Sequence, residues 1–188
     1  KALSKQKRLE VINQSFPILG DYTKSIYKNL NFNLTNAQIQ VLKDVRADFK
    51  SEKPMNRLIQ GDVGCGKTIV AVLASSIICD NKAQVAVMAP TEILAEQHYK
   101  TFKNYFSKHK IICKLLISNI RSKDKKNIKD DLKNGNVNII IGTHALLQEE
   151  VEFKNLGLAI IDEQHKFGVK QRSELARKGG NNCDVLLM

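Results

Sequence analysis

A glycine-rich segment at residues 61–68 carries the strongest chemical signal in the sequence. It reads Gly61-Asp62-Val63-Gly64-Cys65-Gly66-Lys67-Thr68 and fits the pattern GxxxxGK[ST]. Glycines let backbone amides close around phosphate groups, and the helix expected to begin at Lys67 adds positive potential there. We expect Lys67 to reach the β- and γ-phosphates of ATP and the Thr68 hydroxyl to ligate Mg²⁺. We interpret Cys65 as a small residue where serine would also fit, rather than as a reactive thiol.

Two acids, Asp162 and Glu163, follow the apolar run at 158–161. Ligands bind at the carboxyl edge of an open parallel sheet, so acids placed there are candidates for metal and water chemistry. We expect Asp162 to hold Mg²⁺ through water and Glu163 to polarise the water that attacks the γ-phosphate. His165 is either a lone surface histidine or, as we favour, a link between the nucleotide state and nucleic-acid contacts.

Hydroxyl residues occur at two further strand ends. Pro90 and Thr91 follow the run at 84–89, and Thr143 follows the run at 137–141. Strand-end hydroxyls and helix N-termini can grip a phosphate backbone, although ordinary helix capping is the alternative. Gln38 precedes the glycine-rich segment by a helix and a loop, and its amide is a candidate for recognising adenine.

Apolar runs that alternate with helical segments must position these residues. The runs lie at 56–60, 84–89, 111–117, 137–141, 157–161 and 184–188, and helices are expected at 67–79, 92–108, 122–133 and 169–177. Continuous apolar runs are typical of strands buried on both faces. The sequence therefore predicts an α/β fold with a central, mainly parallel sheet and helices on both faces.

The first part of the chain differs from the rest. Residues 1–30 show apolar residues at helical spacing, but Pro17 and Gly20 interrupt the pattern, which favours an extension or linker outside the main core. A helix is expected over 37–49, with Thr35 or Asn36 as its N-cap.

Composition narrows the class of protein. The 188 residues carry a net charge of +11, which favours nucleic acid as a partner, although 24 of the 30 basic residues are lysine and many stand beside acids. The four cysteines lack metal-ligand spacing, as expected of reduced thiols in a cytoplasmic protein. No run reaches the roughly 18 apolar residues of a membrane span.

Taken together, the motifs resemble superfamily 2 helicases and, within them, the RecG-type branched-DNA helicases. The phrases that carry the resemblance are NFNLTNAQ (31–38), PMNRLIQGDVGCGKT (54–68), MAPTEILAEQHY (88–99) and GTHALLQEEVEFKNLGLAIIDEQHKFGVKQR (142–172). The resemblance implies that 31–188 is a RecA-like, ATP-binding first motor domain of a bacterial, nucleoid-associated helicase. Residues 1–30 would then be a linker from an N-terminal wedge domain.

The resemblance also assigns roles by position. Gln38 matches the adenine-recognising glutamine, and the catalytic DExH-type box falls on Asp162, Glu163, Gln164 and His165. Motifs that contact the DNA backbone fall on Pro90, Thr91 and Thr143, and the extension of the box found in double-stranded DNA translocases falls on Phe167, Gly168 and Arg172. The resemblance implies a longer protein that would also contain the motif expected after the final VLLM, a second RecA-like domain with its arginine finger, and the wedge. Residues 31–188 alone are expected to hydrolyse ATP poorly.

Two other classes of protein fit parts of the pattern. A small P-loop kinase would also bind ATP at 61–68, but it needs a lid with catalytic arginines, and the chain has only six arginines. A nucleotide-regulated binding module without hydrolysis would have no need of Glu163. DNA-stimulated ATP turnover separates the motor from both.

Overall fold

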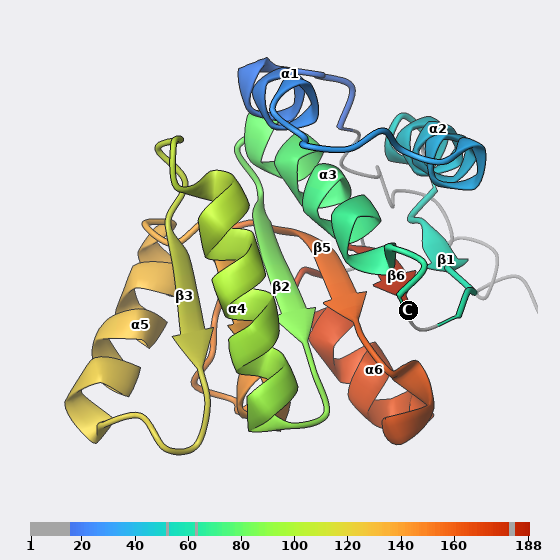
Figure 1. Cartoon of the computed structure of the whole chain (residues 1–188). Coiled ribbons are helices and arrows are strands. Elements are labelled where there is room, and N and C mark those ends of the chain that lie inside the picture. The colour runs from blue at the N-terminus through green and yellow to red at the C-terminus, as the bar shows by residue number, and fades with distance from the viewer. Residues whose placement is uncertain (1–15, 52, 63, 181–182) are drawn as a thin grey trace, which may run out of the picture.

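The computed structural model describes residues 16–51, 53–62, 64–180 and 183–188, and Figure 1 shows the arrangement of their elements. In chain order the elements are α1 (Asp21–Lys28), α2 (Asn36–Phe49), β1 (Asn56–Leu58), α3 (Lys67–Asp80), β2 (Gln84–Met88), α4 (Glu92–Phe106), β3 (Cys113–Leu116), α5 (Ser122–Asn134), β4 (Ile139–Gly142), η2 (His144–Leu147), β5 (Leu156–Ile161), η3 (Gln164–Lys166), α6 (Val169–Arg177) and β6 (Asp184–Leu187).

One sheet organises the domain. Its six strands lie in the order β1-β6-β5-β2-β4-β3, and every neighbouring pair is parallel. Parallel neighbours need crossover connections, which the helices supply, and the carboxyl ends of all strands therefore meet at one edge. The predicted α/β fold with a parallel sheet is confirmed.

The strands bury both of their faces. Successive side chains along a strand point to opposite sides, so β2 divides between two hydrophobic cores. Val85 and Val87 join the core under α3 and α4, whereas Ala86 and Met88 join the core that contains Leu132 of α5 and Leu175 of α6. Helices thus cover both faces, with α3 and α4 in front of the sheet and α6 behind it in Figure 1.

Two of the helices, α2 and α4, begin with threonine N-caps at residues that the sequence offers as capping candidates. Thr35 is the N-cap of α2: its hydroxyl accepts from the backbone N–H of Gln38, and the Gln38 side chain accepts from the backbone N–H of Thr35. Thr91 is the N-cap of α4, where its hydroxyl accepts from the backbone N–H of Leu94. Both caps satisfy backbone donors that a helix leaves unpaired at its start.

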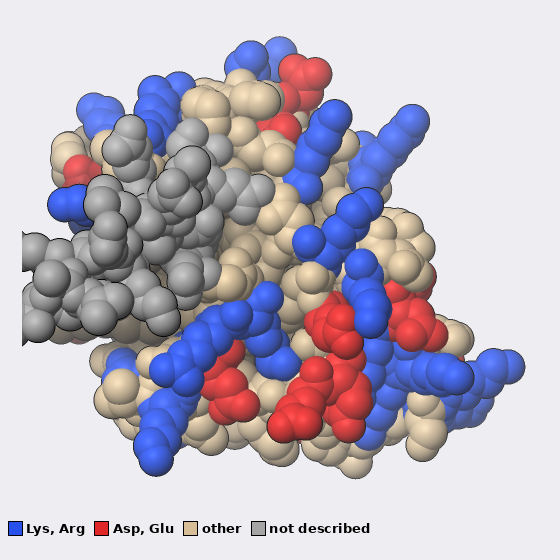
Figure 2. Space-filling view, turned by 180° about the vertical axis from the view of Figure 1, so that it is seen from behind, with Lys and Arg blue, Asp and Glu red and all other residues tan. Residues whose placement is uncertain are grey.

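The basic residues are interleaved with acids on the face seen from behind (Figure 2). Lys133 of α5 pairs with Glu152 at 2.8 Å, and Lys129 pairs with Glu150 at 3.6 Å. Lys178 donates to the backbone carbonyls of Gln148 and Val151. Part of the net positive charge is therefore used to hold the segment that follows η2.

The core begins earlier in the chain than the sequence suggests. Phe16 and Ile26 are only 1 % and 3 % exposed and belong to the core on the α3 side. The expectation that residues before 31 stand apart from the core is wrong for 16–30, because the break at Pro17 and Gly20 turns the chain onto α3 rather than away from it. Residues 1–15 lie outside the described part.

Asp80, at the end of α3, holds α1 in place. Its carboxylate accepts from the backbone N–H groups of Gly20, Tyr22 and Thr23 and from the Thr23 hydroxyl, at 2.6–3.1 Å. The carboxylate therefore serves as an N-cap for α1 supplied by another helix, and its negative charge favours the positive end of the α1 dipole.

Replacing Asp80 tests this cap. Because three backbone donors and one hydroxyl lose a charged acceptor, we expect Asp80→Ala to lower the free energy of unfolding by about 2–3 kcal/mol. Urea unfolding followed by circular dichroism measures the change. Asp130→Ala, at an exposed position of α5, is the control. Equal stability of the two variants would contradict the cap.

Asp184 is a buried acid at the start of β6. Its Oδ1 accepts from the backbone N–H of Met55 at 2.6 Å, and its Oδ2 has no hydrogen-bond partner among the described residues. Burial is the main cause that raises the pKa of Asp184 to about 7. The hydrogen bond from Met55 lowers this pKa, and the nearby negative charge of Asp48 raises it. In the unfolded chain the pKa of Asp184 is near 3.8, the ordinary value for an aspartate side chain.

This pKa predicts how stability depends on pH. Between about pH 4 and pH 7 the folded protein holds a proton on Asp184 that the unfolded chain has lost, so this part of the stability falls as pH rises. Asp184→Asn cannot ionise, and we expect its advantage over the wild type to grow from pH 4 to pH 8. Urea unfolding at several pH values measures it, and parallel stability curves would refute the assignment.

Candidate active site

The glycine-rich segment lies between β1 and α3, at the carboxyl edge of the sheet. Gly64 and Gly66 have φ of +86° and +83°, a left-handed conformation that favours glycine. A Cβ on Gly66 would also collide with the amide of Gln38. Lys67 opens α3, and its Nζ donates to the carbonyl of Gly61 at 2.6 Å. Val63 lies outside the described residues.

Gln38 connects α2 to this loop. Its Oε1 is held by the backbone N–H of Thr35, while its Nε2 donates to the carbonyl of Cys65 at 2.9 Å. The two ends of the amide therefore fix the distance between the start of α2 and the glycine-rich loop. The exposed Cys65 thiol is free.

A cavity of about 500 Å³ opens beside this contact. Gln38, Gly66 and Thr68 line it together with the aromatic side chains of Phe32 and Tyr105. Flat apolar rings beside an amide suit a heteroaromatic base. Neither ring was predicted from the sequence. The only sequence signal for Phe32 was its place in the segment 31–38, six residues before Gln38, and nothing marked Tyr105.

Asp162 lies directly after β5, and its backbone N–H donates to the carbonyl of Met88 in β2. Burial alone would raise the pKa of the Asp162 carboxyl. This effect is outweighed by groups that favour the ionised form: the hydrogen bond and charge of His98, the backbone N–H of Glu163 and the charge of Lys67. The pKa of Asp162 therefore lies below its usual value. Asp162 is therefore ionised at neutral pH. The influence of Lys67 means that the lysine and this acid share one electrostatic environment.

Glu163 has a left-handed backbone, with φ of +51° and ψ of +49°. Non-glycine residues adopt this conformation rarely, and strain of this kind concentrates at functional sites. The strand thus ends in a turn at Glu163, directly after Asp162. Glu163 Oε2 lies 3.3 Å from Nε2 of His165, and both side chains are accessible to solvent.

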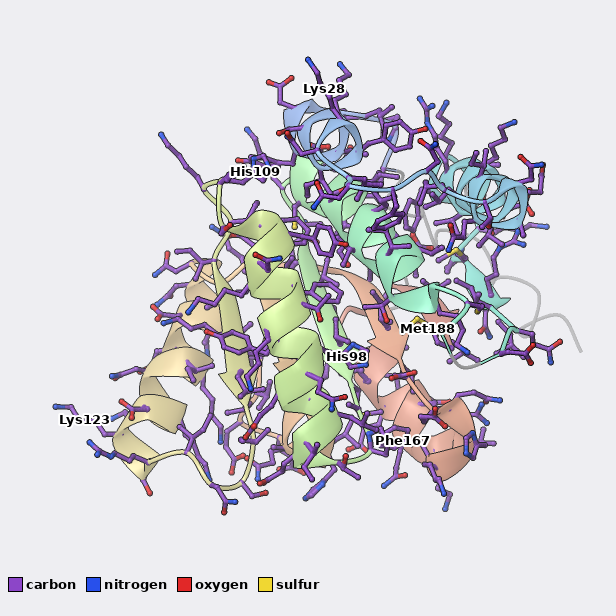
Figure 3. All side chains as sticks on the ribbon, viewed as in Figure 1. Lys28, His98, His109, Lys123, Phe167 and Met188 are labelled. Atoms are coloured by element: carbon purple, nitrogen blue, oxygen red, sulfur yellow. The ribbon has the colours of Figure 1, made fainter. Side chains whose placement is uncertain are left out.

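The next residues interact with α6. The Gln164 side chain accepts a hydrogen bond from the guanidinium of Arg172. Phe167, expected among the nucleic-acid contacts, is 8 % exposed and packs into the core on the α6 side (Figure 3). The structure therefore brings Arg172 to Gln164 of the DExH-type box and places the Phe167 ring in the interior. Contacts of either residue with nucleic acid stay predictions.

Pro90, Thr91 and Thr143 come together at the same edge. β2 and β4 are neighbours, and the backbone N–H of Ala89 donates to the carbonyl of Gly142 at 2.9 Å. Thr91 uses its hydroxyl as a helix cap, and Thr143 is 2 % exposed, with no hydrogen-bond partner for Oγ1 among the described residues. The structure groups the three residues, and their contact with a nucleic-acid backbone stays a prediction.

The donor set fits Mg²⁺ held with a nucleotide. Among the described residues no group of three or more His, Cys, Asp or Glu side chains could enclose a metal. Mg²⁺ retains waters and commonly takes one or two protein oxygens together with phosphate oxygens. A threonine hydroxyl at the start of α3 and an ionised Asp162 supply oxygens of this kind.

Comparison with known proteins agrees with this geometry. Residues 35–186 match the DEAD/DEAH box helicase family, and the chain belongs to that family. It is similar to the ATP-dependent DNA helicase RecG of Thermotoga maritima, with 53 % identity over 174 residues, which cover 91 % of the chain and 22 % of the relative. It is also similar to RecG of Bacillus subtilis, with 50 % identity over 161 residues, which cover 86 % of the chain and 24 % of the relative.

A solved structure gives the same result. The structure of RecG bound to a three-way DNA junction superposes with a TM-score of 0.84 at 44 % identity, and the match covers 100 % of this chain and 25 % of that one. The RecA-like helicase fold is therefore confirmed. The chain spans about a quarter of the length of these relatives. Within the described residues, no helix is both long enough and apolar enough to cross a membrane.

Lys67→Ala tests the nucleotide site. Removing the ammonium group that is expected to meet the phosphates should weaken ATP binding by more than about tenfold, since hydrogen bonds to charged groups contribute about 1.5–3 kcal/mol. Isothermal titration calorimetry measures the affinity. Lys82→Ala, an exposed lysine just beyond the other end of α3, is the control. Unchanged affinity in Lys67→Ala would remove the lysine from the site.

Proposed function

We propose that the chain is the first motor domain of an ATP-dependent DNA helicase that remodels branched DNA such as forks and junctions. The observation that carries the proposal is the position of Lys67 and Asp162 at the carboxyl edge of one parallel sheet, where Lys67 opens α3 and Asp162 directly follows β5. The same edge holds Thr91 and Thr143, the residues expected to meet a DNA strand. Nucleotide and nucleic acid would thus act on one set of strand-end loops.

The side chains divide the chemistry of ATP hydrolysis among them. Lys67, which donates to the Gly61 carbonyl, would exchange that carbonyl for phosphate oxygens, and Gln38, which donates to the Cys65 carbonyl, would present its amide to adenine. Thr68 and Asp162 would hold Mg²⁺, which neutralises phosphate charge when bound. Glu163 accepts the proton of the attacking water, and its neighbour His165 is placed to respond to that change.

Two further domains of a longer protein would complete the motor. A second RecA-like domain would close over the nucleotide and supply an arginine finger, which can contribute about 10³–10⁵ in rate. A wedge domain, joined through residues 1–30, would contact the branch point of the DNA. These partners follow from the similarity to RecG, for which a junction complex is known. A bacterial, cytoplasmic location near the nucleoid fits this role.

Family membership disfavours the two alternatives, a small P-loop kinase and a nucleotide-regulated binding module. A metabolite kinase does not share the DExH-type box at 162–165, and a binder without turnover has no use for the strained Glu163. Membership of the DEAD/DEAH box helicases favours the motor over both.

ATP hydrolysis by the full-length protein, with and without a forked DNA duplex, tests the proposal. We expect strong stimulation by the fork in the wild type. Glu163→Gln should retain ATP affinity and lose about 10²–10⁴-fold in hydrolysis, the usual contribution of a general base. Turnover indifferent to DNA would overturn the motor assignment, and full activity of Glu163→Gln would overturn the role of that acid.

A further inference from the structure

A histidine from α4 meets the metal-site acid. His98 Nε2 lies 2.6 Å from Oδ2 of Asp162, although the two residues are 64 positions apart in the chain. The histidine is 8 % exposed, and in Figure 3 it points from α4 toward the end of β5. The sequence motifs gave no role to His98, and the chemistry proposed above does not use it.

The contact fixes the direction of the hydrogen bond. Aspartate carboxyl groups ordinarily ionise at about pH 4, and an ionised carboxylate only accepts hydrogen bonds, so His98 donates from Nε2 to Oδ2. The other oxygen, Oδ1, accepts from the backbone N–H of Glu163 at 2.9 Å. Each carboxylate oxygen therefore has one donor, and the two donors come from different elements.

Two donors on opposite oxygens determine how the carboxylate can rotate. With only the Glu163 N–H, the group could turn about its last torsion, because terminal carboxylate torsions are broad. The bond from His98 selects one orientation, and each oxygen keeps a lone pair for a further partner. Groups that orient metal ligands in this way typically alter metal affinity or activity by 10–100-fold when they are changed.

We propose that His98 is a positioning residue that holds the Asp162 carboxylate in the orientation required to bind Mg²⁺ with the nucleotide. It acts through Asp162 and does not touch the reacting atoms. The inference deepens the proposed function and rests on it, because it assumes that Asp162 takes part in metal binding.

A pair of amide variants separates positioning from packing. His98→Gln places an amide N–H at the reach of the imidazole Nε2, whereas His98→Asn places the same group one carbon too short. Both remove the ring, so their effects on packing are similar. His109→Asn controls for the loss of a histidine elsewhere. His109 lies beyond the end of α4, and its ring centroid is 5.5 Å from that of Tyr22.

The measurement is made on the full-length protein with Mn²⁺ and a non-hydrolysable ATP analogue. Electron paramagnetic resonance gives the Mn²⁺ affinity directly, without turnover. We expect His98→Asn to weaken Mn²⁺ binding by about tenfold and to raise the half-saturating Mg²⁺ concentration for ATP hydrolysis similarly. His98→Gln and His109→Asn should stay close to the wild type in both measurements, and thermal unfolding should be alike in the two His98 variants.

The outcomes are distinct. Wild-type Mn²⁺ affinity in both His98 variants would overturn the inference, and equal loss in both, with lowered melting temperatures, would show a packing role and overturn it too. Absence of ATP hydrolysis in the wild type would instead reject the proposed function.

Discussion

Parallel pairing of all six strands is the constraint on which the site depends. A parallel strand can be followed by its neighbour only after the chain has crossed back over the sheet, and the helices that make these crossings cover both faces. Every loop that follows a strand then lies at the same edge. Residues spread from 61 to 165 become neighbours without any direct pairing between them, because the hydrogen-bonded register sets where each strand ends.

The same constraint explains why unusual backbone conformations collect there. A strand must turn sharply into a helix within a few residues, and three of these positions, Gly64, Gly66 and Glu163, are left-handed. Glycine adopts that conformation without strain, whereas Glu163 has a side chain that must be tolerated. The strained residue is also the one expected to accept a proton, so the turn that costs stability lies at the proposed general base.

Much of the fold and the local chemistry could be predicted from the sequence because they depend on short patterns. The strand runs, the cap at Thr35 and the start of α3 at Lys67 are local features, and the structure places them as predicted. The burial of Phe16, the His98–Asp162 contact and the Arg172–Gln164 bond were not predicted. They depend on how helices rotate and pack against the sheet, and local patterns in the sequence do not reveal such long-range packing.

We propose that one edge of the sheet binds ATP and Mg²⁺ through Lys67, Thr68 and Asp162. A crystal structure of the protein with Mg²⁺ and a non-hydrolysable ATP analogue would test this binding site. We expect Lys67 to leave the Gly61 carbonyl for the phosphates, and the metal to lie near the Thr68 hydroxyl and the Asp162 carboxylate. A nucleotide bound elsewhere, or a metal remote from Asp162, would show that this edge is not the ATP site.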